Sequence, residues 1–223
     1  MTITALAAGI AFAVIGAGAE RLASVWPADE ASRRGPGLRT VLLALGAGAA
    51  GGAVAWRSTL PAYALAVHLL ILAILVLLTA TDLEQRRLPH LLLDPLIVVA
   101  ALFVPFNPTV GWADALIGGV VAVGFMGILG LVVRGGVALG DLYLVGPIGL
   151  VLGWPAIFVA VFVAGLLSAV ASALLLVSRR AGLKSYIPFG PFLVAGMVVT
   201  LLRDPALLGQ VAAALSAGAP SLR

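Results

Sequence analysis

Two aspartates, Asp82 and Asp141, place ionisable side chains beside long apolar runs. A carboxylate near the centre of a membrane span costs about 2.5–3.5 kcal/mol, so each of the two indicates a functional site. Two neighbouring carboxylates can hydrolyse a peptide bond, because like charges resist joint ionisation: one group stays ionised to activate water while the other stays protonated to donate to the carbonyl. No metal-ligand spacing accompanies them, so we expect neither a metal nor a cofactor.

Each aspartate also has a structural explanation. Asp82 could mark the end of a span, although a carboxylate at a helix C-terminus faces the negative end of the macrodipole. Asp141 could be a helix N-cap, a position that suits Asp. Gly140 lacks a side chain and would let another backbone approach Asp141 closely. A coupled pair titrates as a unit, so the pattern does not assign base and acid to individual residues.

The composition predicts a chain that lies in a membrane. Of its 223 residues, 62% are hydrophobic and 10% are charged, with a mean hydropathy of +1.19; a soluble domain carries about 25% charged residues. We therefore expect one all-α, polytopic membrane domain over residues 1–223. The net charge of +4 is expected to reflect loop topology rather than binding of nucleic acid. The chain has no cysteine, which excludes disulfides and a cysteine nucleophile within it.

Apolar runs long enough to cross a bilayer, about 17–25 residues each, predict about eight spans. The expected spans cover residues 2–19, 40–56, 62–81, 88–104, 112–133, 139–153, 156–178 and 187–202. The first run is expected to be a retained span rather than a signal peptide, because its basic residues follow it. Residues 20–39 are expected to form a short cytoplasmic connector. Residues 206–217 are too short and polar to predict a ninth span.

The basic residues predict an orientation with the N-terminus outside. That orientation puts ten of the thirteen Lys and Arg residues in cytoplasmic loops and leaves Arg57, Arg203 and Arg223 outside. Asp82 then ends span three and Asp141 begins span six. Both carboxylates are therefore expected at the cytoplasmic face.

Four ordered segments resemble motifs of the type IV prepilin peptidases, a family of GxGD-type membrane aspartic proteases. Asp82-Leu-Glu-Gln-Arg-Arg-Leu-Pro89 resembles the first aspartate motif, in which an aliphatic–Pro pair follows the Asp, and the segment ending in Gly140-Asp141 resembles the GxGD motif. Gly149-Leu-Val-Leu-Gly-Trp154 and Ile187-Pro-Phe-Gly-Pro-Phe192 resemble two further family segments. The resemblance covers about residues 62–202.

The resemblance implies an aspartic endopeptidase in the cytoplasmic membrane of a prokaryote, multi-pass and with its active site facing the cytoplasm. Its substrates would be prepilin-like or pseudopilin-like proteins of type IV pili or protein secretion, cut after a short basic leader and ahead of an apolar helix. Asp82 and Asp141 match the catalytic pair. We expect Gly140, Pro89, Pro188 and Gly190 to border the substrate.

The sequence departs from the family pattern at three places. Ala138 replaces the first glycine of GxGD, and Tyr143 replaces a common lysine two residues after the second aspartate. A cytosolic insert between the first two spans, often with paired CxxC motifs, is expected to be absent. The short form without this insert, in a chain that has no cysteine, is not expected to have the N-methyltransferase activity of many members.

Other polar residues and other functions were weighed against this prediction. Asp94 and Asp114 are expected to be paired or interfacial carboxylates, and His68 and His90 to be structural. The prolines and glycine at 188–191 are expected to break span eight, and either shape a substrate groove or merely kink a helix. The main alternative is a transporter or channel whose aspartates carry protons or cations. Others are a related protease for preflagellins and an inactive scaffold relative.

Overall fold

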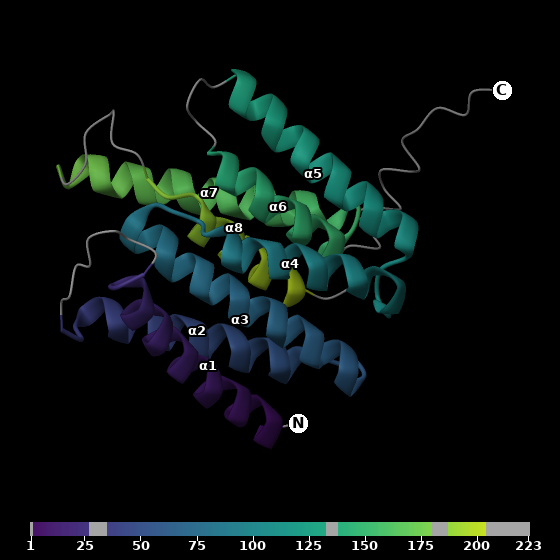
Figure 1. Cartoon of the computed structure of the whole chain (residues 1–223), viewed down its shortest axis with the longest axis horizontal. Coiled ribbons are helices and arrows are strands. Elements are labelled where there is room, and N and C mark those ends of the chain that lie inside the picture. The colour runs from purple at the N-terminus through teal and green to yellow at the C-terminus, as the bar shows by residue number, and fades with distance from the viewer. Residues whose placement is uncertain (1, 27–34, 133–137, 180–186, 204–223) are drawn as a thin grey trace.

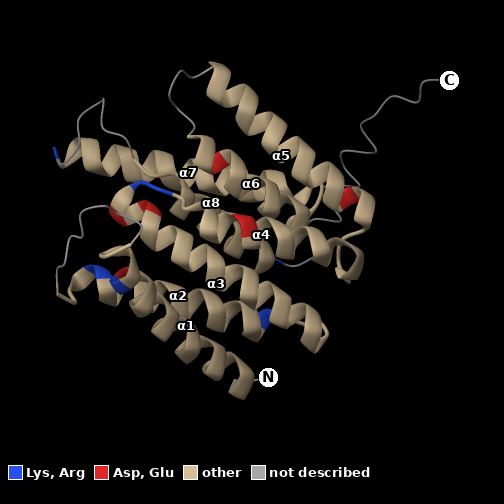
Figure 2. Ribbon diagram, viewed as in Figure 1, with Lys and Arg blue, Asp and Glu red and all other residues tan. Residues whose placement is uncertain are grey.

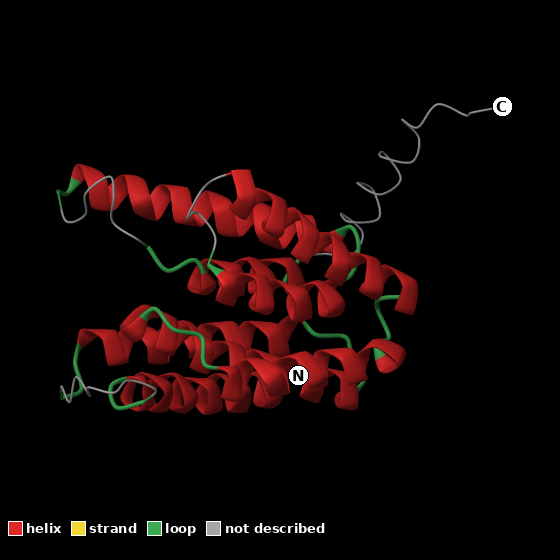
Figure 3. Ribbon diagram, turned by 45° about the horizontal axis from the view of Figure 1, so that its top comes forward, coloured by secondary structure: helices red, strands yellow, loops and turns green. Residues whose placement is uncertain are grey.

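The computed structural model describes residues 2–26, 35–132, 138–179 and 187–203, and these residues fold into helices and loops without a strand (Figures 1 and 3). The α-helices are α1 (Thr2–Ala23), α2 (Leu38–Arg57), α3 (Ala62–Gln85), α4 (His90–Phe103), α5 (Trp112–Val132), α6 (Leu139–Leu152), α7 (Ala156–Val177) and α8 (Gly190–Leu201). A 3-10 turn, Val104–Phe106, extends α4. The all-α prediction is confirmed.

Within the described part of the chain, five helices (α1, α2, α3, α5 and α7) are long and apolar enough to cross a membrane, and α4, α6 and α8 are shorter apolar helices. Each predicted span corresponds to one helix, with different ends. The first helix extends beyond residue 19 to Ala23, and the last begins at Gly190 rather than at residue 187. Residues 206–217 lie outside the described part of the chain. The protein is an integral membrane protein with several spanning helices.

Helix α3 lies at the centre of the packing (Figure 1). It contacts the α1–α2 hairpin on one side and α4 and α8 on the others, while α6 packs against α4, α5 and α8. Its buried face includes Ile71, Leu72, Leu75 and Leu78, all fully inaccessible. The other large buried side chains come mainly from α4, α6 and α8. Helices α3, α6 and α8 therefore share one core, which fixes their ends relative to one another.

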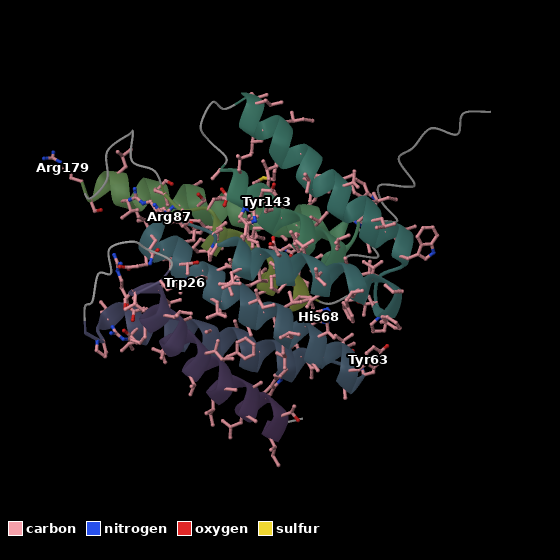
Figure 4. All side chains as sticks on the ribbon, in the orientation of Figure 1. Trp26, Tyr63, His68, Arg87, Tyr143 and Arg179 are labelled. Carbon is pink, nitrogen blue, oxygen red and sulfur yellow. The ribbon has the colours of Figure 1, made fainter. Side chains whose placement is uncertain are left out.

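The bundle has two distinct ends. One end holds Asp82 and Asp141, and we call it the carboxylate end; there α3 ends and α4, α6 and α8 begin. At the opposite end, α3 and α5 begin. Most of the charged residues in the described segments lie toward the carboxylate end (Figure 2). Arg87 and Arg179 lie there with Trp26, whereas Tyr63 lies at the opposite end (Figure 4). Helix ends from distant parts of the sequence thus come together at the carboxylate end.

Candidate active site

Asp82 lies in the last turn of α3 and is buried, with 4% of its surface exposed. The helix ends three residues later because Arg86 adopts a left-handed conformation, with φ of 54°, and its N–H donates to the Asp82 carbonyl at 2.9 Å. A left-handed residue at this position is a common way for a helix to stop. The Asp82 carboxylate itself turns toward α8, where its Oδ2 accepts a hydrogen bond from the Gly190 N–H at 3.1 Å.

This hydrogen bond uses a free N–H at the first turn of α8. The first backbone N–H groups of a helix have no intrahelical acceptor, and the helix dipole there favours an anion. Gly190 is also required sterically, because a Cβ at that position would lie 2.6 Å from Asp82 Oδ2. The N-terminus of α8 therefore holds the carboxylate of α3 in place.

Asp141 lies in the first turn of α6 and is 2% exposed. The structure shows that Asp141 is not the N-cap, since Ala138 occupies that position. Asp141 stands three residues later, and its Oδ2 accepts a hydrogen bond from the Ala138 N–H at 3.3 Å. Asp141 thus satisfies a backbone donor that would otherwise be free, in a location where the helix dipole favours negative charge.

The two carboxylates lie close enough for a direct Coulombic interaction. Three of the sequence motifs meet around them. Gly140 lies close against Leu88 of the first aspartate motif: a Cβ added to Gly140 would lie 2.9 Å from Leu88 Cδ1. Gly190, in the segment Ile187–Phe192, donates its N–H to the Asp82 carboxylate. Two buried acidic groups at the end of a membrane bundle can support acid–base hydrolysis.

The remaining predicted site residues, Pro89 and Pro188, lie in the segments that lead into α4 and α8. Pro89 is the N-cap of α4 and connects it to the loop that follows Asp82. Pro188 is half-buried in the loop before α8. Pro191 lies in the first turn of α8, so the expected break inside span eight is wrong: the prolines precede and begin the helix rather than kink it, because proline fits the first turn, where its missing N–H costs nothing.

Sequence reasoning missed a small cluster beside the pair. His90 Nδ1 lies 3.4 Å from Asp94 Oδ1, and the His90 ring stacks edge-on against Tyr143 with centroids 5.3 Å apart. The spacing of four residues between His90 and Asp94 was the available signal. Both side chains are well exposed. Among the described residues, no group of three or more His, Asp and Glu gathers as a metal site would require.

The fold and the site define a class: polytopic helical membrane proteins with a pair of buried carboxylates at one end of the bundle. Residues 69–173 match the model of the type IV leader peptidase family, so this stretch is similar to these peptidases and the resemblance inferred from its motifs is confirmed. The matched stretch contains both Asp82 and Asp141.

The chain is also similar to curated prepilin leader peptidases. The chain is 26% identical over 140 residues to a prepilin leader peptidase/N-methyltransferase of Bacillus subtilis, covering 61% of this chain and 55% of that protein. It is 30% identical over 152 residues to one of Aeromonas salmonicida and 31% identical over 152 residues to one of Aeromonas hydrophila, covering 65% of this chain and 52% of each. The chain therefore spans about half the length of these relatives. No solved structure matches the chain.

Proposed function

We propose that this protein is a membrane aspartic endopeptidase that removes the short basic leader of prepilin-like or pseudopilin-like proteins. Asp82 and Asp141 would form the catalytic pair. The observation that carries the proposal is the convergence of two buried carboxylates from α3 and α6, inside the stretch that matches the leader peptidase family. The same match favours proteolysis over ion transport as the task of the pair.

Hydrolysis by the pair needs two proton transfers. The ionised carboxylate takes a proton from a water molecule as the water oxygen attacks the scissile carbonyl carbon, and the protonated carboxyl donates to the carbonyl oxygen. The resulting tetrahedral diol collapses when the amide nitrogen takes a proton and the C–N bond breaks. The leader leaves with a new carboxyl terminus, and the apolar helix keeps a new amino terminus.

The site also has features that suit an extended substrate. Gly140 and Gly190 remove side chains next to Asp141 and Asp82, while Pro89 and Pro188 stiffen the adjoining loops. We propose that these four residues border the scissile segment. The proposal is limited to proteolysis: the N-methyltransferase activity in the relatives' names is not carried over to this chain.

The proposed location is the cytoplasmic membrane of a prokaryote, with the N-terminus outside and the carboxylate pair at the cytoplasmic face. The positive-inside rule supports this orientation. Arg21, Arg39, Arg86, Arg87 and Arg179 belong to helix ends or loops at the carboxylate end, whereas Arg57 and Arg203 are at the opposite end.

The test is leader cleavage by aspartate variants. Asp82→Asn and Asp141→Asn are each expected to abolish cleavage of a co-expressed pilin-like protein, measured by gel mobility, because the neutral amide cannot take a proton from water. Both variants are expected to insert and fold, since an amide oxygen can still accept the Gly190 or Ala138 N–H. Asp114→Asn, in the first turn of α5 at the opposite end, is the matched control and is expected to cleave normally. Full processing by either catalytic variant would contradict the proposal.

A further inference from the structure

A groove of about 720 Å³ begins near the carboxylate end of α3 and runs along the bundle between α2 and α8. Its walls include Gly46 and Ala49 of α2 and Pro191 and Ala195 of α8, and its floor is α3 at Thr79 and Ala80. We refer to this feature as the α2/α8 groove. It arises because α2 and α8 both pack on α3 but scarcely touch each other.

The lining of the groove includes residues next in sequence to Asp82 and to Gly190. Thr79 lies one helical turn before Asp82 on α3, and Leu83 directly follows Asp82. On the other wall, Pro191 directly follows Gly190, whose N–H bonds to Asp82. A segment lying in the groove would therefore have one end next to the part of α3 and α8 that holds Asp82 and Gly190.

The polarity of the groove changes along its length. Among the described residues, charged groups line it only near the carboxylate end, where Arg39 of α2 and Glu84 of α3 form an ion pair of 2.9 Å. From Leu42 to Ala53 of α2 and from Val194 to Leu202 of α8, the lining residues are apolar. A segment with a polar junction at one end and an apolar body matches this order.

The dimensions suit a helix. The lining of α2 runs from Arg39 to Ala53, which corresponds to about 21 Å or about four turns of helix. Gly46 and Ala49 present small side chains, which let another helix approach closely within a membrane. The space is open as well, because a Cβ on Gly46 would meet no atom within 4 Å.

The floor of the groove adds a polar feature. The Thr79 hydroxyl oxygen is buried and has no hydrogen-bond partner among the described residues. A buried hydroxyl without a partner is costly, so a group that fills the groove and bonds to it would be stabilised. A helix that carries a polar side chain close to its cleavage junction would offer such a group.

We propose that the α2/α8 groove binds the apolar membrane-spanning helix of the substrate and thereby delivers the scissile bond to the carboxylate pair. This inference rests on the proposed function. It assigns a role to α2, which lies outside the stretch of 69–173 that matches the leader peptidase family. The α1–α2 hairpin would then select which apolar helices are cut.

The first test fills the groove. Gly46→Leu places a side chain in open space on the wall, and Gly124→Leu is the control: Gly124 is also exposed with open space around it, and both glycines stand eight residues from the carboxylate end of their helices. With a designed substrate of basic leader, glycine and apolar helix, Gly46→Leu is expected to slow cleavage by about tenfold or more. Gly124→Leu is expected to cleave at the wild-type rate.

A second probe separates docking from chemistry. A short peptide that contains the leader and cleavage site but lacks the apolar helix is expected to be cut equally by wild type and Gly46→Leu in detergent. If the wild-type protein cuts neither probe, the proposed function fails. If it cuts the helix-bearing substrate and Gly46→Leu cuts it equally fast, the proposed function stands and the groove inference is overturned.

Cross-linking decides the question even if Gly46→Leu does not fold. The chain contains no cysteine, so Ala49→Cys introduces its only thiol. In the Asp141→Asn background, which would leave the substrate uncut, Ala49→Cys is expected to form a disulfide with a single cysteine in the substrate's apolar helix when a thiol oxidant is added, and Gly124→Cys is not. Equal or absent cross-linking at both positions would overturn the groove inference.

Discussion

At the scale of single residues, the position of the Asp82 carboxylate depends on the absence of a Cβ at Gly190. The carboxylate occupies the space that a Cβ on Gly190 would take, and it accepts the N–H of the same residue. The contact is therefore both a steric fit and a hydrogen bond. Gly140 has a related role on α6, where the absence of a side chain admits Leu88. The missing side chain at each glycine thus allows close contact between two motifs: Gly190 with Asp82, and Gly140 with Leu88.

Gly190→Ala is expected to reduce leader cleavage by about 100-fold, because displacing a reacting group by about 1 Å can cost that much. The added Cβ would lie 2.6 Å from Asp82 Oδ2, closer than real Cβ contacts, so the carboxylate or the start of α8 must move. The measurement is the cleavage rate at equal protein levels. Gly124→Ala, which meets open space, is the control and is expected to behave as wild type. An unchanged rate for Gly190→Ala would show that the contact does not position Asp82.

At the scale of helices, hydropathy and length predicted the number and order of the elements well. Helix α3 is a long apolar stretch with acidic residues in its last turn, and its extent was predicted to within a few residues. The Gly190–Asp82 contact was not predictable, since it joins residues 108 positions apart and depends on how α8 packs against α3. The place of Asp141 at the third helical position was also missed, because an aspartate after a glycine-rich turn suits an N-cap equally well.

The contact between α5 and α6 holds the helix that carries Asp141. Gly118 and Gly149 pack directly on each other, and a Cβ on Gly149 would lie 2.6 Å from the Gly118 carbonyl oxygen. Gly149→Val is therefore expected to destabilise the protein by about 1–3 kcal/mol, as overpacking of a close contact does. A thermal unfolding series in detergent measures this loss. Gly124→Val, on the exposed face of α5, is expected to change stability much less; equal losses for both variants would contradict the explanation.

At the scale of the whole molecule, the two ends of the bundle differ in chemistry. Large exposed aromatic side chains, Trp56, Trp112 and Trp154, occupy helix ends at the end opposite the carboxylates. Trp and Tyr gather at membrane–water interfaces, so this end is expected to lie at one interface. The carboxylate end, with most of the described arginines, is expected to lie at the other. Under the proposed function, a leader cut in the cytoplasm requires the second interface to be the cytoplasmic one.

This orientation is testable with single cysteines, because the chain supplies none of its own. Arg87→Cys lies at the carboxylate end and Thr109→Cys in the loop between the 3-10 turn and α5 at the opposite end, and both positions are exposed. A membrane-impermeant maleimide is expected to label position 109 in intact cells and position 87 only after permeabilisation, because the positive-inside rule keeps the arginine-rich end in the cytoplasm. Retained leader cleavage by both variants is the control for folding. Labelling of position 87 in intact cells would place the carboxylate pair outside, where it would not meet a leader before export.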